Sequence, residues 1–487
     1  MEVLLKIWIF FVNNILTQPA YFIGFIVLIG YILLKKPWYE CLAGFLKATV
    51  GYLILTVGSG GLVSNFRPIL VGLKDKFNLQ ATVIDPYYGQ NAVQSAMEHI
   101  GKSFSQVMLL LLIAFIFNIL LVAFRKITKI RSIFTTGNVQ IQQAATAFWL
   151  IFFCFPELGD TPILIVMSLL LGLYWAVGSN LTVEITQDLT EGGGFCVAHQ
   201  QIFALKIFST IAEKIKGKGE GKKLEDIKLP GFLSIFNENM VSTAILMLLF
   251  FGIILITLGK DYLIENKFMK EGQSFFFYTL TTALYFAVYL AILQLGVRTF
   301  VTELTQSFQG ISTRLLPGAV PGIDCAATFG FGSANAVTIG LLFGAAGQFL
   351  AIITLILLKS PVVIIAGFIP VFFDNATIAV FANNRGGVKA ACILPFISGL
   401  CQVFGSAFIS YWVGLAAYGG YLGMWDWAVL WPGFTIIMKY LGYIGIGIVA
   451  LILIAIPQIQ YKKNKDTYFL ITDDYEAYKE KMKSKIN

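Results

Sequence analysis

Long apolar runs without a charged residue follow one another along the chain and decide its class. A helix needs about 20 apolar residues to cross a bilayer, and several runs approach or exceed this length. The clearest runs are Trp8–Leu34, Val107–Phe124, Pro162–Val183, Met240–Leu258, Phe275–Val297, Ala334–Leu358 and Phe434–Ile456. Two shorter runs, Ala144–Phe155 and Val362–Phe373, are typical of half-helices or re-entrant segments. The pattern predicts an all-α polytopic membrane protein with about ten or eleven transmembrane helices plus re-entrant hairpins.

Composition supports the membrane class and excludes several kinds of enzyme. Hydrophobic residues make up 57% of the 487 positions and charged residues 13%, whereas about 25% of the residues in a soluble domain are charged. The first apolar run is too long for a signal peptide and has no small-residue cleavage site, so we expect it to be the first span. Nucleotide-binding and hydrolase motifs are absent from the sequence. We therefore expect a protein that is not an enzyme by itself and uses no cofactor.

Cysteine and histidine usage gives no reason to expect a metal. The six cysteines show no C-x-x-C or other metal-ligand spacing, so we interpret them as small apolar packing residues. Only two histidines are present, which excludes a metal site built from a histidine cluster.

Basic residues gather between the apolar runs and predict the topology. They form three segments: Arg125–Arg131, Lys206–Lys228 and the tail after Lys462. Short loops rich in Lys and Arg stay in the cytosol, so we expect all three segments and the C-terminus to be cytoplasmic. The pair Lys35 and Lys36 would place the N-terminus outside. The net charge of +8 thus reflects membrane topology, and we expect no nucleic-acid partner.

A polar, glycine-rich stretch at Gly217–Asp226 divides the chain into two halves. We expect a first membrane half over residues 1–216, a cytoplasmic linker over 217–228, a second membrane half over 229–460 and a charged cytoplasmic tail over 461–487. Each half contains an apolar segment rich in glycine and proline, Gly58–Pro68 in the first and Gly310–Gly318 in the second. Interrupted segments at corresponding positions are typical of transporters built from inverted repeats, with the binding site between them.

Polar residues at membrane depth are costly, so they usually face a cavity or a polar partner. Four groups are conspicuous: Ser59 with Asp85–Tyr88, Asn138–Gln143, Gly192–Gln201, and Asp324 with Asn335. Amide side chains both donate and accept hydrogen bonds, as sugar hydroxyls do, and a carboxylate can accept from two hydroxyls. A lone Gln is more often a contact between helices, and a lone His a packing residue. An intramembrane carboxylate such as Asp324 is a functional candidate by default.

Several longer stretches resemble the ascorbate-specific permease (enzyme IIC) of the bacterial phosphotransferase system. They are Gly58–Pro68, His199–Ala204, Lys228–Ile245, Gly296–Leu304, Phe308–Ala327 and Gly367–Asn383. The resemblance implies a homodimer in the bacterial cytoplasmic membrane, with a core domain that carries the substrate and a second domain that forms the dimer. It also implies an elevator-like movement of the core. The substrate would be phosphorylated by a separate IIB protein, which is itself charged by a IIA protein.

The resemblance also implies which residues contact the substrate. They are Ser59, Tyr87, Gln142, His199, Gln200 and Asp324, with Asn138 at a position where the family typically has a histidine. Pro86 replaces a threonine, and the stretch after Asp324 is richer in glycine. Ascorbate is an anion at neutral pH, and a neutral donor such as Asn138 binds an anion less strongly than a cationic one. The predicted substrate is therefore ascorbate or a related sugar acid, sugar or polyol.

A second hypothesis is an ion-coupled secondary transporter for a small polar solute. Such a protein needs carboxylates or carbonyls around Na⁺ or H⁺. Asp324 is the only acidic residue deep in the membrane that the sequence suggests for this role.

Overall fold

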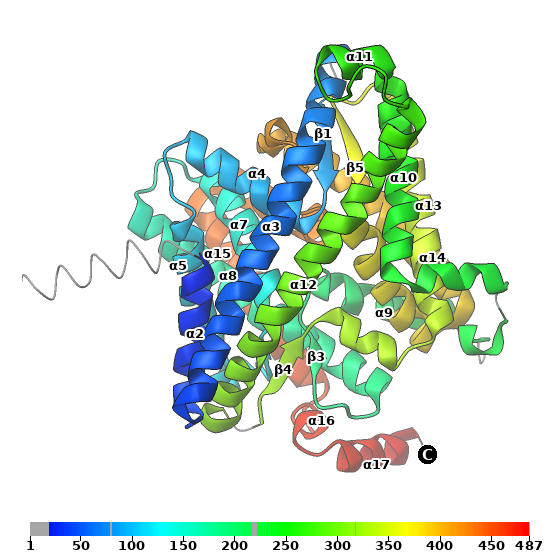
Figure 1. Ribbon diagram of the computed structural model, residues 1–487. Coiled ribbons are helices and arrows are strands. Elements are labelled where there is room, and N and C mark those ends of the chain that lie inside the picture. The colour runs from blue at the N-terminus through cyan, green and yellow to red at the C-terminus, as the bar shows by residue number, and fades with distance from the viewer. Residues whose placement is uncertain (1–18, 78–79, 217–221, 229, 317, 487) are drawn as a thin grey trace, which may run out of the picture.

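The computed structural model describes residues 19–77, 80–216, 222–228, 230–316 and 318–486, and helices dominate it (Figure 1). The α-helices are α2 (Pro19–Leu33), α3 (Trp38–Phe77), α4 (Pro86–His99), α5 (Ser105–Ala123), α6 (Arg125–Thr128), α7 (Gly137–Cys154), α8 (Asp160–Thr190), α9 (Ile202–Lys216), α10 (Asn239–Leu258), α11 (Lys260–Glu265), α12 (Phe275–Leu315), α13 (Ala334–Leu357), α14 (Asn375–Trp412), α15 (Trp431–Lys463), α16 (Leu470–Asp473) and α17 (Tyr475–Ile486).

Within the described residues, six helical stretches are long and apolar enough to cross a membrane. They are Trp38–Gly58, Ser105–Ala123, Asp160–Thr190, Asn335–Leu357, Pro370–Trp412 and Asp426–Lys463, and three shorter apolar helices accompany them. The predicted class of a helical, multi-pass membrane protein is confirmed. The predicted ten or eleven spans exceed the six long helices found in this part of the chain.

Two small parallel sheets, which the sequence analysis did not predict, lie among the helices. Their strands are β1 (Gln80–Ile84), β2 (Ser132–Phe134), β3 (Cys196–Val197), β4 (Val320–Ile323), β5 (Val362–Ala366) and β6 (Gly420–Tyr421). One sheet has the order β5-β1-β6 and the other the order β2-β4-β3. The run at Val362, predicted as a half-helix or a re-entrant segment, begins with strand β5 and continues into a helical segment at Pro370–Asp374. Pairing these strands satisfies the backbone N–H and C=O groups of non-helical segments buried inside the protein.

The middle strand of each sheet follows one of two very long helices. α3 has 40 residues and leads into β1, and α12 has 41 residues and leads into β4. These helices lie side by side and pack with α2 and α10 as one group (Figure 1). The buried Glu303 of α12 accepts a hydrogen bond from Tyr31 of α2 at 2.6 Å and one from Lys47 of α3 at 3.2 Å. The predicted interruption at Gly58–Gly61 is wrong, because α3 continues through it and ends only before β1.

The remaining long helices form a second group around the two sheets. Within it α13 packs on α14, α14 on α9, α5 on α8, and α4 on α7. Arg385 of α14 pairs with both Asp188 of α8 and Glu213 of α9. The segment from Lys206 was predicted as a loop, but its first part is helix α9, and Lys206 pairs with Glu184 at 3.3 Å.

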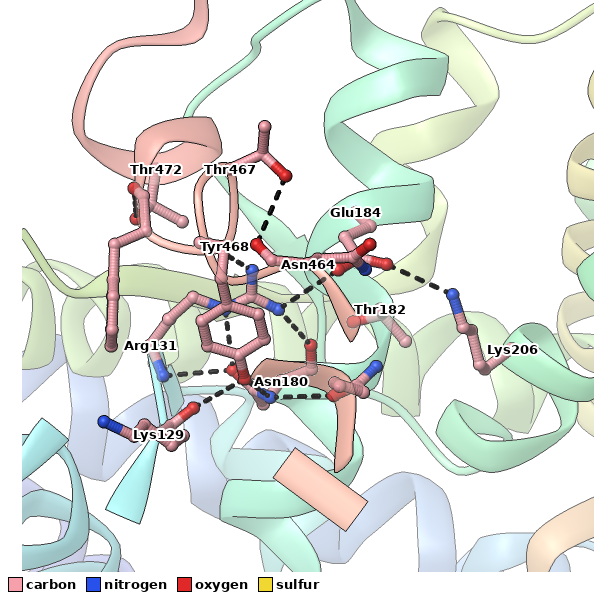
Figure 2. Close-up of polar contacts among 12 residues, drawn as sticks. Lys129, Arg131, Asn180, Thr182, Glu184, Lys206, Asn464, Thr467, Tyr468 and Thr472 are labelled. Carbon is pink, nitrogen blue, oxygen red and sulfur yellow. Dashed lines mark hydrogen bonds and ion pairs between the residues drawn. The ribbon is translucent and has the colours of Figure 1, made fainter. Parts of the chain in front are cut away.

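The chain turns back after α15, and residues 464–486, here called the C-terminal segment, fold against the second helix group. The segment contains α16 and α17, which lie beneath β3 and β4 in the view of Figure 1. Its anchor is Tyr468, which is 1% exposed and lies against the fully buried Arg131 (Figure 2).

Candidate functional site

The strands of the β2-β4-β3 sheet each end just before predicted site residues. β2 leads into the first turns of α7, which carry Asn138 and Gln142. β3 ends two residues before His199, and β4 ends directly before Asp324. All three strands are parallel, so their carboxyl ends meet at one edge of the sheet. The fold thereby gathers residues that lie far apart in the sequence.

The polar side chains form a connected group at this edge. Gln200 donates to the side-chain oxygen of Gln142 at 2.9 Å. The imidazole Nε2 of His199 lies 3.8 Å from a carboxylate oxygen of Asp324. Tyr87 comes from the first turn of α4, after β1 of the other sheet, and its hydroxyl lies within hydrogen-bonding reach of Asn138 and Gln142. All predicted site residues with described side chains are therefore neighbours.

Ser59 is the exception among the predicted contacts. Its backbone belongs to α3, but its side chain lies outside the described residues, so its role stays a prediction.

The orientation of His199 is set by a glutamine that the sequence analysis included in a polar cluster but gave no role. Gln201 donates through Nε2 to the carbonyl oxygen of Phe373 at 3.2 Å, so its Oε1 faces His199 Nδ1, at 2.7 Å. An amide oxygen only accepts, so Nδ1 carries a proton and a neutral imidazole turns its Nε2 lone pair toward Asp324. Nε2 and the carboxylate are then both acceptors, and since a hydroxyl group donates only one hydrogen bond, each can accept from a different hydroxyl of a ligand.

A further hydrogen-bond chain fixes the backbone beside the site. Gln143 donates to the carbonyl oxygen of His199 at 3.1 Å, and its own side-chain oxygen accepts from Trp175 at 2.6 Å. Gln143 and Trp175 are both fully buried. Because each partner is held by packing, the loop that carries His199 and Gln200 is rigidly placed.

Two buried acceptors of the site have no partner within the described residues: Asn138 Oδ1 and Gln200 Oε1. A buried acceptor without a hydrogen bond costs about 1–3 kcal/mol. A bound ligand with hydroxyl groups would remove this cost by donating to both.

One group of potential metal ligands lies within the described residues: His199, Asp324 and Cys325, whose ligand atoms are all within 4.8 Å of one another. Burial raises the pKa of the Cys325 thiol well above its ordinary value.

The expectation that Asp324 is the only deep acid is wrong. Asp85, Asp374 and Asp426 are at most 1% exposed, whereas the Asp324 side chain is 40% exposed. The three buried carboxylates accept hydrogen bonds from backbone N–H groups of Tyr87, Trp425, Phe203 and Ala204. They therefore hold the starts of α4, α9 and the helical segment Asp426–Leu430 in place. Their signal in the sequence is the same as that of Asp324, a lone acid within or beside an apolar run.

These features define a class: a multi-pass membrane protein whose polar site lies where short buried strands give way to helices. A family model described as the PTS system sugar-specific permease component, EIIC-GAT, matches residues 14–428, and the chain belongs to this family. It is also similar to a protein of Mycoplasma pneumoniae named Ascorbate-specific PTS system EIIC component, with 33% identity over 434 residues. That match covers 81% of this chain and 65% of the relative, so the chain spans about two thirds of the relative's length.

Proposed function

We propose that this protein is the sugar-translocating permease of a phosphotransferase system and carries ascorbate or a related sugar acid, sugar or polyol. The main support for the proposal is that five polar residues lie together in one group: Tyr87, Gln142, Gln200, His199 and Asp324. The group offers a phenol, amides, an imidazole and a carboxylate, which together match a ligand with several hydroxyl groups. The name of the Mycoplasma pneumoniae relative favours ascorbate among such ligands.

The start of α7 favours a ligand that carries negative charge. Its N-cap, Thr136, makes no side-chain hydrogen bond to the helix, so no side chain of this cap occupies the first N–H groups. These N–H groups and the helix dipole favour an anion near Asn138, at the second position of α7. The start of α7 would attract an ascorbate anion. This attraction would replace part of what a histidine at position 138 would supply.

The two sheets support an arrangement of inverted repeats. In each half of the chain a helix of about 40 residues leads into the middle strand of a sheet, which then ends at an aspartate, Asp85 or Asp324. Each aspartate caps the helical turn that follows by accepting from the backbone N–H two residues later. We propose that the second helix group is the core that moves with the substrate, and that α2, α3, α10 and α12 form the dimer.

Coupling to phosphorylation requires access from the cytoplasm. We propose that the C-terminus and the basic segments face the cytosol of a bacterium and that a IIB protein, charged by a IIA protein, phosphorylates the substrate there. The positive charge of short loops supports this orientation. Phosphoryl transfer would be carried out by the IIB protein, and the permease would supply the bound substrate.

The test is uptake of labelled ascorbate into vesicles that contain this protein, with and without its IIA and IIB partners. We expect accumulation of a phosphorylated product only when the partners and phosphoenolpyruvate are present. If ascorbate is not taken up, the same assay with pentitols, hexitols and other sugar acids identifies the substrate. Uptake that needs no partner and follows an ion gradient would overturn the proposal and favour the ion-coupled transporter.

Introducing a histidine at position 138 should tighten binding of an anionic substrate. Asn138→His adds a donor that can carry a positive charge, and a charge-assisted hydrogen bond is stronger than a neutral one by about 1 kcal/mol, or about 5-fold in affinity. The measurement is the dissociation constant for ascorbate at pH 6 and pH 8, where the gain should be larger at the lower pH because more of the imidazole is protonated. An equal affinity for wild type and variant at both values would place position 138 away from the charge.

A further inference from the structure

We propose that the C-terminal segment is a latch that positions the substrate site, and that Tyr468 and Arg131 are its positioning residues. The proposal rests on the proposed function, because it assumes that the group around His199 and Asp324 binds the substrate. The sequence analysis placed Tyr468 in a charged tail and Arg131 in the basic segment Arg125–Arg131, and it gave neither residue a role in the site. Three observations carry it: the clamp around Tyr468, the packing of the segment on the site-bearing sheet, and the hydrogen bonds that lead from that sheet to the site.

The contacts of Tyr468 with Arg131, Asn180 and Lys129 are here called the clamp. They join the C-terminal segment to Arg131, the residue just before β2 (Figure 2). Arg131 Nη1 donates to the carbonyl oxygen of Tyr468 at 2.6 Å, and the guanidinium carbon lies 3.6 Å from the centre of the Tyr468 ring. The Tyr468 hydroxyl accepts from Asn180 at 2.9 Å and donates to the carbonyl oxygen of Lys129 at 2.6 Å. The segment thus supplies both an acceptor and an aromatic face to a buried cation.

The rest of the Arg131 guanidinium depends on α8. Its Nε donates to Asn180 Oδ1 at 3.1 Å, and Nη2 lies 3.9 Å from a carboxylate oxygen of Glu184. Arg131 is 0% exposed, and a buried cation that loses partners is strongly destabilised. Release of Tyr468 would therefore force Arg131, and with it the start of β2, to move toward solvent.

The C-terminal segment also packs against the other two strands of the same sheet. Ile471 of α16 is 2% exposed and lies in an apolar cluster with Cys196 of β3 and Val320 of β4. Tyr475 and Tyr478 of α17 cover this cluster. The segment therefore contacts β3 and β4 through packing and β2 through the clamp, so it touches all three strands that carry the site.

Short hydrogen bonds connect these strands to the site residues. The carbonyl oxygen of Arg131 accepts from Val320 at 2.8 Å, which aligns β2 with β4. At the other end of the sheet Ala198 donates to the carbonyl oxygen of Ile323, also at 2.8 Å. Ala198 and Ile323 directly precede His199 and Asp324. A shift of the sheet at Arg131 would therefore change the spacing between the imidazole and the carboxylate.

The experiment compares the full-length wild type with Tyr468→Ala, Tyr468→Phe and a control, Tyr39→Ala, in detergent. Tyr39 lies on α3, is 60% exposed and is distant in the sequence from the clamp. Its substitution by Ala removes the same side-chain atoms as Tyr468→Ala. Hydrogen–deuterium exchange reports on the strands at 130–136, 194–200 and 318–326, and equilibrium binding of labelled ascorbate reports on the site. Tyr468→Phe keeps the ring and the main-chain acceptor and loses only the hydrogen bonds of the hydroxyl.

We expect Tyr468→Ala to raise exchange in all three strands by roughly 10-fold, because the sheet opens locally more often. Ascorbate affinity should fall about 2- to 30-fold, the range found when residues of a coupled network are changed without touching the ligand. Tyr468→Phe should lie between wild type and Tyr468→Ala, and Tyr39→Ala should match wild type in both measurements.

Unchanged exchange in the strands of Tyr468→Ala, or faster exchange with an unchanged ascorbate affinity, would overturn the latch. A wild type that does not bind ascorbate contradicts the proposed substrate instead, and the exchange measurement then decides whether the segment holds the sheet. If Tyr468→Ala yields no folded protein, Tyr468→Phe decides by the same two measurements, since it leaves the clamp partly intact.

Discussion

We expect Asp324→Asn to lower the affinity for the substrate by about 100-fold or more, because it would remove the charged acceptor of the proposed site. Hydrogen bonds to charged groups contribute about 1.5–3 kcal/mol each, and a carboxylate can accept from two hydroxyls. Equilibrium binding of labelled substrate to the purified protein measures the effect, and the uptake assay should show a parallel loss.

The substitution should leave the local fold intact, so a loss of affinity can be assigned to binding. Asp324 accepts a hydrogen bond from the backbone N–H of Ala326 at 2.9 Å and caps the short helix Cys325–Gly330. Asn is about as good a cap as Asp, so thermal unfolding of the variant should match that of wild type. A near-normal affinity in a folded variant would contradict the role assigned to Asp324.

We expect Asp426→Ala to destabilise the protein by about 3–5 kcal/mol, because it leaves several buried donors without an acceptor. The carboxylate of Asp426 accepts from the Tyr174 hydroxyl at 2.8 Å and from the backbone N–H groups of Phe203 and Ala204 at 3.0 Å. These N–H groups belong to the first turn of α9, which follows His199–Gln201 directly. Thermal unfolding in detergent measures the loss, and substrate affinity should fall with it.

Two comparisons separate this effect from a general sensitivity to losing an acid. Asp426→Asn keeps one side-chain oxygen as an acceptor and should lose about half as much stability. Asp466→Ala removes an exposed carboxylate and should change stability by less than about 0.5 kcal/mol. Wild-type stability of Asp426→Ala would show that the start of α9 is held by its packing rather than by this carboxylate.

The membrane class could be predicted from the apolar runs alone, because the bilayer sets the length and composition of a spanning helix regardless of the rest of the fold. The runs at Val107–Phe124 and Ala334–Leu358 correspond closely to α5 and α13. The number of spans was less predictable. In α14 and α15 the chain bends at a glycine with non-helical backbone angles, Gly387 and Gly442, so an apolar stretch does not correspond to one straight helix.

The candidate site was also visible in part, because polar side chains at membrane depth are costly and few. Asn138, Gln142, His199 and Gln200 stand beside apolar runs, and the structure places them together with Tyr87. The supporting residues were harder to predict. Asp426 contacts α9 from 222 positions away in the sequence, and nothing in its local sequence indicates which helix start it holds.

The membrane environment, the helical class and the residue types of the candidate polar site could be predicted from the sequence. These follow from local quantities: the length of an apolar run and the cost of a polar group within it. The pairing of β2, β3 and β4, which brings the candidate site residues to one edge, and the contact of Tyr468 with Arg131, 337 positions away, depend on the tertiary structure. Strands of two to four residues carry almost no periodicity, so their pairing depends on the helices that surround them.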